Sequence, residues 1–235
     1  MSRKRAAKHN NVYNLEDALV NNVRAIQEGP TRRKTWSLHD LKQIKPYTPP
    51  QTEMIYDFMQ GRNLVAHGSA GTGKSFIASF LALNAILDPT TDQNQIIIVR
   101  SAVPTREVGH LPGTIEEKMA VYEEPYVEIF AELMGRHSTY NDMKEAGKVK
   151  FASTSFIRSI TWNNAIIIAD ECQNMEWTEI DTVATRVGRN SRIIFCGDTK
   201  RQGDLRGKQQ TGIHNLVQVA DRMGGFSNVV FTKHD

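Results

Sequence analysis

The sequence predicts an α/β fold in which helices cover both faces of a parallel β-sheet. Three observations support this prediction. Continuous apolar runs at 96–99 and 165–169 lie within segments, 95–100 and 165–170, that have the length of buried strands. Patterns typical of helices alternate with such segments along the chain, as they do in parallel sheets. A glycine-rich turn at 68–73 joins one expected strand directly to a helix.

Prolines mark the start of the folded region. They exclude a helix where they stand and indicate a domain boundary, at Pro46, Pro49 and Pro50. Beyond them, apolar residues at 54, 55, 58 and 59 have helical spacing, which predicts a helix over 52–60 that Gly61 ends. We therefore expect a basic arm at 1–46 and one domain at 47–235.

The next three elements surround the glycine-rich turn. Residues 63–67 have the pattern of a short buried strand. A strongly apolar helix is expected at 74–87, and Asp88-Pro89 ends it. A second strand follows at 95–100, with Ile-Ile-Ile-Val in its middle.

The second half of the chain continues the alternation. Residues 101–147 are expected to be irregular and then helical over roughly 115–134, with prolines 104, 112 and 125 as interruptions. The next expected elements are strands at 148–152, 165–170, 191–196 and 228–232 and helices at 176–186 and 213–223.

The composition excludes several classes of protein. At 235 residues, 40% hydrophobic and 23% charged, the chain is neither disordered as a whole nor collagen-like. Its apolar runs are too short to cross a bilayer, so we expect no membrane partner. No apolar stretch follows the basic residues after Met1, so we expect no signal peptide, and two cysteines, Cys172 and Cys196, are too few for a disulfide framework. We expect a cytoplasmic protein in which the cysteines form a buried pair.

The positive charge is concentrated near the N-terminus. The chain carries 29 Lys and Arg against 26 Asp and Glu, a formal net charge of +3. Residues 1–47 hold ten bases and four acids, or +6, so the rest is mildly acidic. The arm is either a solvated tail or a segment that contacts nucleic-acid phosphates.

The glycine-rich turn matches the phosphate-binding P-loop, Gly-x4-Gly-Lys-[Ser/Thr], in full. The matching residues are Gly68, Ser69, Ala70, Gly71, Thr72, Gly73, Lys74 and Ser75. Glycines let the backbone N–H groups point inward, and the following helix N-terminus adds to this anion site. Lys74 reaches the β- and γ-phosphates, and the hydroxyl of Ser75 ligates Mg²⁺. This motif predicts ATP and Mg²⁺ as ligands.

An acidic pair, Asp170-Glu171, stands at the end of the expected strand at 165–170. Asp170 completes the Mg²⁺ site with Ser75, and Glu171 orients or deprotonates the water that attacks the γ-phosphate. Because one strand, 95–100, lies between the P-loop strand and the acidic strand in sequence, we expect the acidic strand to adjoin the P-loop strand in space. This predicts a RecA-like, doubly wound P-loop NTPase.

A third polar loop follows the strand at 191–196. Asp198 and Gln202 are candidates for sensing the γ-phosphate, because this strand ends at the same crevice. The loop is also basic, through Lys200, Arg201, Arg206 and Lys208. It is either a solvated loop or a nucleic-acid contact coupled to hydrolysis. Upstream of the P-loop strand, Gln51 is a weaker candidate for reading adenine through its amide.

Together these blocks resemble the PhoH-like family, whose ATPase core is related to superfamily 1 helicases. The resemblance runs from about Tyr47 to the C-terminus. It rests on the P-loop, on Asp170-Glu171-Cys172-Gln173-Asn174, on Gly109-His-Leu-Pro-Gly113 with Glu117-Lys118, on Phe156-Ile-Arg158, on Thr185-Arg186-Val-Gly188, and on Gly197-Asp198 with Gln202.

The resemblance implies ATP hydrolysis, a helicase-like action on RNA or DNA, and assembly into a ring, with a hexamer expected. It strengthens Gln51 as the adenine reader. In a ring, Arg158 or Arg186 could reach the γ-phosphate of a neighbouring subunit, since arginine stays charged and forks onto phosphate oxygens. A structural ion pair is the alternative for each arginine.

The chain also departs from the family pattern. The Asp-x-Val-Arg block expected after the last strand is absent from the sequence, as is a PIN-type nuclease segment. The short chain resembles phage-encoded versions. Four histidines show no zinc-ligand spacing with the cysteines, namely His67, His110, His137 and His214.

Our leading hypothesis is a ring-forming, Mg²⁺-dependent ATPase that acts on single-stranded RNA or DNA, with RNA favoured. The rival is an interaction protein that uses ATP to switch its assembly and does not unwind nucleic acid. A small-molecule kinase is disfavoured by Asp170-Glu171.

Overall fold

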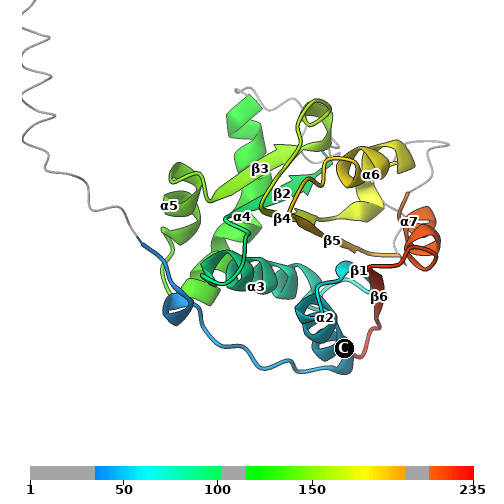
Figure 1. Ribbon diagram of the computed structural model, residues 1–235, viewed down its shortest axis with the longest axis horizontal. Helices are drawn as coiled ribbons and strands as arrows, with labels where there is room; N and C mark the ends of the chain where they lie inside the picture. The colour runs from blue at the N-terminus through cyan, green and yellow to red at the C-terminus, as the bar shows by residue number, and fades with distance from the viewer. Residues whose placement is uncertain (1–34, 102–114, 200–211) are drawn as a thin grey trace, which may run out of the picture. The chain divides into compact units, whose positions relative to one another are not determined.

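The computed structural model describes residues 35–101, 115–199 and 212–235, with no account of the side chains of 115–118. Within it, Trp36–Asp235 form one compact unit. Six parallel strands form a single sheet in the order β3-β2-β4-β5-β1-β6 (Figure 1). The strands are β1 (Asn63–Gly68), β2 (Gln95–Arg100), β3 (Val149–Ser153), β4 (Ala165–Ala169), β5 (Arg192–Gly197) and β6 (Phe226–Phe231).

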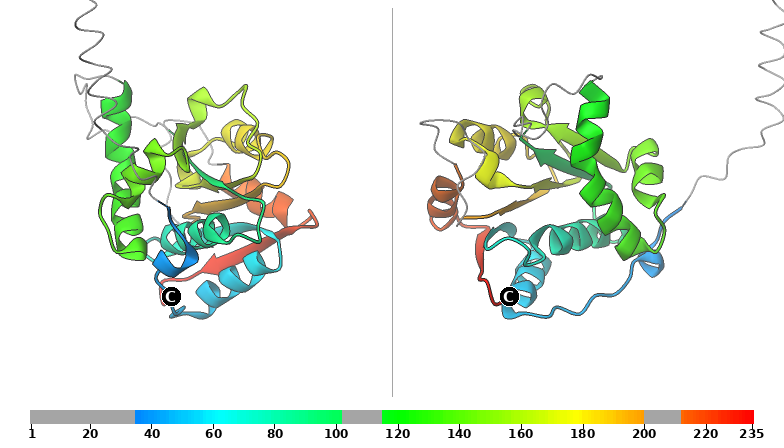
Figure 2. Two further views of the ribbon diagram at one scale, coloured as in Figure 1. Left: turned by 60° about the vertical axis from the view of Figure 1, so that its left-hand side comes forward. Right: turned by 180° about the vertical axis from the view of Figure 1, so that it is seen from behind.

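Helices lie on both faces of this sheet (Figure 2). On one face are α2 (Pro49–Met59), α3 (Lys74–Leu87), α4 (Ile115–Met134) and α5 (Thr139–Glu145). On the other face are α6 (Trp177–Ala184) and α7 (Ile213–Ala220). Short 3₁₀ turns occupy Leu38–Asp40, Thr154–Phe156 and Cys172–Asn174. This arrangement confirms the predicted doubly wound, RecA-like α/β fold.

Alternation of apolar side chains gives the sheet its two cores. In β2, Ile96 and Ile98 pack with the α3 side, whereas Ile97 and Val99 pack with the α6 side. Because a parallel strand is buried on both faces, the side chains that point to either face are apolar. The sequence therefore shows continuous apolar runs at these strands. Leu41 is buried in the α3-side core, so the chain ahead of residue 47 already contributes to the compact unit.

The predicted position of the acidic strand is wrong in one respect. β4 does not adjoin the P-loop strand β1, because β5 lies between them and pairs with both. The acidic pair still reaches the P-loop, because all strands are parallel and their carboxyl ends share one edge of the sheet.

Two statements about prolines are also wrong. Pro49 and Pro50 do not precede the first long helix but form its first turn, where a missing N–H and a fixed φ are tolerated. Pro125 lies inside α4 and does not interrupt it. Helix α5 was not predicted, and Pro104 and Pro112 lie outside the described residues.

Both cysteines, Cys172 and Cys196, are free and buried, which confirms their predicted burial. Among the helices that the structure describes, none is long and apolar enough to cross a bilayer.

Candidate active site

A cavity of about 300 Å³ opens at the carboxyl edge of the sheet. Three connections meet there: the loop between β1 and α3, the residues after β4, and the residues after β5. Its lining comprises residues 70–76, Asp170, Glu171, Gln173, Gly197 and Asp198. The structure therefore brings together the P-loop, the acidic pair and Asp198, as the three sequence blocks predict.

Two glycines fix the path of the P-loop. Gly68 has a φ of +127°, and a Cβ there would lie 1.9 Å from the backbone oxygen of Phe231 in β6. Gly73 occupies the N-cap of α3 with a φ of +84°, in the left-handed region that glycine adopts without strain. Close strand packing and the turn into α3 thus both require glycine.

The ammonium group of Lys74 lies inside the P-loop. Its Nζ donates to the carbonyl of Ser69 at 2.5 Å and to the hydroxyl of Thr72 at 3.2 Å. The side chain is buried, and this burial lowers the pKa of Lys74. A desolvated cation held by neutral oxygens is well suited to exchange them for the charged oxygens of a phosphate.

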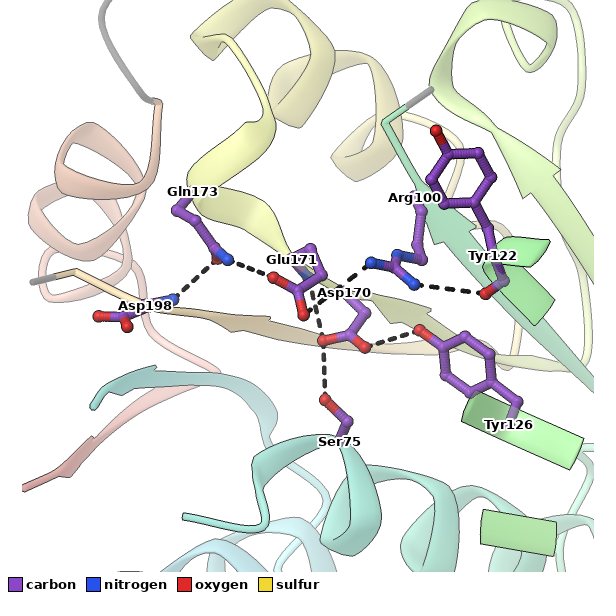
Figure 3. Close-up of polar contacts among 8 residues, drawn as sticks. All are labelled: Ser75, Arg100, Tyr122, Tyr126, Asp170, Glu171, Gln173 and Asp198. Atoms are coloured by element: carbon purple, nitrogen blue, oxygen red, sulfur yellow. Dashed lines mark hydrogen bonds and ion pairs between the residues drawn. The ribbon is translucent and has the colours of Figure 1, made fainter. Parts of the chain in front are cut away.

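The hydroxyl of Ser75 donates to Oδ1 of Asp170 at 2.9 Å (Figure 3). The other oxygen of this carboxylate accepts from the hydroxyl of Tyr126 in α4 at 2.6 Å. Asp170 itself is buried. A serine hydroxyl and one carboxylate side by side fit Mg²⁺, which is typically held by one or two protein oxygens together with phosphates and waters.

Glu171 has an unusual backbone conformation and two polar neighbours. Its φ is +57°, in the left-handed region that non-glycine residues seldom adopt. One carboxylate oxygen accepts from the amide of Gln173, and the other lies 3.9 Å from Nη2 of Arg100. Burial and the neighbouring Asp170 raise the pKa of Glu171. A raised pKa moves a carboxylate toward the range useful to a general base.

Gln173 connects the acidic pair with the end of β5. Its Oε1 accepts from the backbone N–H of Asp198 at 2.9 Å, while its amide donates to Glu171. Asp198 is buried and lines the cavity. Gln202 and the basic residues at 200, 201, 206 and 208 lie outside the described residues.

Gln51 lies against the P-loop and not in its cavity. Its amide donates to the carbonyl of Thr72 at 3.2 Å and accepts from the backbone N–H of Tyr47 at 2.9 Å. Both ends of the amide thus have protein partners in this structure.

Arg158 and Arg186 lie away from the cavity of their own chain. Arg186 follows α6, and its Nη1 donates to the backbone carbonyl of Arg158 at 2.7 Å. Neither residue lines the cavity, and Arg158 is exposed. The contact between them thus joins the side chain of Arg186 to the backbone of Arg158.

Sequence reasoning missed Tyr126 and Arg100. Arg100 carried a usable signal, since it ends a predicted strand at the edge where the acidic strand also ends. Tyr126 carried none, because helical spacing does not say which part of a long helix approaches which strand.

A P-loop that meets a strand-end acidic pair on a parallel sheet defines a P-loop nucleotide-binding protein of the α/β class. The family model described as PhoH-like protein matches residues 43–235. The chain belongs to this family.

Curated relatives agree with this assignment. The chain is 35% identical to a PhoH-like protein of Synechocystis over 147 residues, which is 62% of this chain and 44% of the relative. It is 31% identical to a PhoH-like protein of Mycobacterium leprae, over 77% of this chain and 51% of the relative. Protein PhoH of Escherichia coli is 34% identical, over 73% of this chain and 48% of that protein. The chain spans about half the length of the curated relatives it matches.

Solved structures are similar at a lower level. A SWI2/SNF2 ATPase core from Sulfolobus solfataricus, in complex with dsDNA, matches 83% of this chain and 47% of its own at 12% identity and a TM-score of 0.46. The Pif1 helicase from Candida albicans matches 82% of this chain and 42% of its own at 14% identity and a TM-score of 0.40.

Proposed function

We propose that this chain is an Mg²⁺-dependent ATPase in which Glu171 activates the attacking water. The observation that carries the proposal is the 2.9 Å hydrogen bond between Ser75 and Asp170 beside the P-loop, with Glu171 lining the same cavity. A serine hydroxyl, a strand-end carboxylate and a second carboxylate with a raised pKa are the groups that phosphoryl transfer to water needs.

The proposed reaction is an in-line displacement at the γ-phosphorus. Water forms a bond to phosphorus, the bond from phosphorus to the β–γ bridging oxygen breaks, and ADP leaves with that electron pair. Glu171 accepts the proton of the water, and Lys74 places its charge against the phosphate oxygens. Ser75 and Asp170 would hold Mg²⁺, which when bound would neutralise charge on the phosphates.

Two further roles belong to the same proposal. Asp198, with Gln202, senses the γ-phosphate, since Asp198 lines the cavity beside Glu171. Gln51 reads adenine by exchanging its bonds to Thr72 and Tyr47 for bonds to the base edge. Its position against the P-loop supports this, because the adenine of a bound nucleotide must lie within reach of the phosphates.

Phosphate release from ATP tests the hydrolysis. The full chain should release phosphate in the presence of Mg²⁺, and this release should stop when a chelator is added. Lys74→Ala should abolish release, because the phosphates lose their nearest cation. An equal rate in this variant, purified in the same way, would assign the activity to a contaminant and refute the proposal.

We further propose that the ATPase acts on single-stranded RNA or DNA, with RNA the first choice from the family resemblance. The +6 arm and the basic residues around 200–208 support a phosphate-contacting surface. Stimulation of ATP hydrolysis by single-stranded RNA at low salt, lost at high salt, is the expected result. Hydrolysis that nucleic acid never changes would favour the rival, an ATP-driven assembly switch.

The third part of the proposal is that the chain forms a ring. In this ring, Arg158 or Arg186 completes the active site of the neighbouring subunit. Both arginines stand away from their own cavity, which supports a role toward another subunit. Mixing tests it: Arg158→Ala and Lys74→Ala are each expected to be inactive. A mixture should recover activity, because an intact P-loop then meets an intact arginine. The second mixture combines Arg186→Ala with Lys74→Ala. If neither mixture recovers activity, the proposed action of an arginine on the neighbouring subunit is refuted.

We place this activity in the cytoplasm. The two free, buried cysteines support a reducing compartment.

A further inference from the structure

Arg100 emerges beside the acidic pair because of strand register. It is the last residue of β2, whose Val99 stands opposite Ala169 of β4. The backbone N–H of Asp170 donates to the carbonyl of Val99 at 2.9 Å, so the two strand ends are fixed to each other. The Arg100 side chain therefore starts next to Asp170 and Glu171.

The guanidinium of Arg100 lies between Glu171 and α4 (Figure 3). Nη2 is 3.9 Å from Oε1 of Glu171, and Nη1 donates to the backbone carbonyl of Tyr122 at 3.3 Å. The guanidinium carbon also lies 5.7 Å from the centre of the Tyr122 ring. Only 18% of the arginine side chain is exposed, and Arg100 does not line the P-loop cavity. Arg100 thus contacts Glu171 from outside the P-loop cavity.

The other oxygen of the Glu171 carboxylate is held by a contact that leads to β5. This oxygen accepts from Gln173, which is itself bonded to the backbone of Asp198 after β5. The left-handed backbone of Glu171 costs about 1–2 kcal/mol, and such a conformation persists where its surroundings determine it. Glu171 is therefore fixed on one side from β5 and on the other from β2 and α4.

We propose that Arg100 is a positioning residue for hydrolysis, which holds the Glu171 carboxylate where it accepts the proton of the attacking water. This inference rests on the proposed role of Glu171. The side chain of Arg100 contacts Glu171 and Tyr122 and does not line the P-loop cavity, so its contribution falls on turnover and not on nucleotide binding. Tyr122 supports it by accepting the Nη1 hydrogen bond and lying against the guanidinium.

The test uses the full chain with Arg100→Met, Arg100→Lys and the control Arg62→Met. Arg62 is an exposed arginine just ahead of β1, at the opposite edge of the sheet. Arg100→Met should lower kcat about tenfold or more while the Kd of a fluorescent ATP analogue changes less than about twofold. Arg100→Lys should recover part of the loss, since it restores the charge but not the fork that reaches Tyr122. Arg62→Met should leave both constants unchanged.

A double-mutant cycle separates positioning from a general structural role. In the Glu171→Gln background, Arg100→Met should have little further effect on the residual rate, because Arg100 acts through that carboxylate. An equal loss in both backgrounds, or a loss of ATP-analogue binding that matches the loss of kcat, overturns the proposal. If Glu171→Gln itself turns over like the parent chain, the role of Glu171 fails first. If only Arg100→Met is silent, the positioning role alone fails.

Discussion

The hydroxyl of Tyr126 donates a 2.6 Å hydrogen bond to Oδ2 of Asp170, and both side chains are buried. This bond occupies one carboxylate oxygen and leaves the other to Ser75 and to the backbone N–H of Glu171. Helix α4 thereby orients the carboxylate that we assign to Mg²⁺. A residue outside the P-loop motif and the acidic pair thus fixes the geometry between them.

Tyr126→Phe tests this orientation. A hydrogen bond to a charged group contributes about 1.5–3 kcal/mol, so the free energy of unfolding in urea should fall by that amount. The Mg²⁺ concentration for half-maximal ATP hydrolysis should also rise several-fold, since Asp170 is then free to turn.

Tyr140→Phe is the matched control for that substitution. Tyr140 is another buried tyrosine that donates to a carboxylate, Oε2 of Glu123 at 2.8 Å, outside the cavity lining. Tyr140→Phe should lower the free energy of unfolding without changing the Mg²⁺ dependence of ATP hydrolysis. An equal Mg²⁺ shift in both variants would contradict the orienting role of Tyr126.

Gly68→Ala should destabilise the fold far more than Gly71→Ala. At Gly68 a Cβ would overlap the backbone oxygen of Phe231, and this backbone is held in place because β6 pairs with β1 over its whole length. At Gly71 nothing lies within 4 Å of a Cβ, so only the positive φ of +75° opposes alanine. We expect a loss of about 1–2 kcal/mol at Gly71 and a larger loss, or failure to fold, at Gly68. Equal unfolding midpoints for the two variants would show that β6 does not press on Gly68.

His67 should make stability depend on pH. Its ring is buried on the strand β1, and neither nitrogen has a hydrogen-bond partner among the described residues. Burial lowers its pKa, with His214 and Lys74 acting in the same direction and Asp221 against them. The unfolded chain therefore binds the proton at higher pH than the folded chain. Stability should be full above about pH 6.5 and should fall as the pH drops through the lower folded pKa.

The measurement is the thermal midpoint at pH 7.5 and 5.0 for the parent chain, His67→Leu and the control His137→Leu. His137 is exposed. The parent and the control should lose more stability between the two pH values than His67→Leu does. The same loss in all three would mean that other groups cause the pH dependence.

Local sequence rules predicted most of the sheet and the P-loop. Strands such as β2 and β4 are buried on both faces, and this makes them visible as apolar runs. The P-loop glycines and Ser75 were predictable because phosphate binding restricts residue type and spacing. The six-residue strand β5 was predicted as an element, but its place between β1 and β4 was not. Pairing between strands depends on contacts that no local pattern records.

The supporting residues of the site were less predictable. Arg100 and Tyr126 act through the partners that the fold gives them, and neither belongs to a short motif. The prolines at the start of α2 were misread because proline breaks a helix interior but suits its first turn. The phage origin, the ring and the nucleic-acid partner stay predictions.

The turnover of Glu171→Gln tests the central claim most directly. Glutamine keeps the shape of the side chain but cannot accept the proton of water at neutral pH. Loss of a general base lowers the rate about 10²- to 10⁴-fold, so ATP hydrolysis should nearly stop while the Kd of an ATP analogue is retained. Unchanged turnover with intact binding would contradict the account, because the water would then be activated by another group.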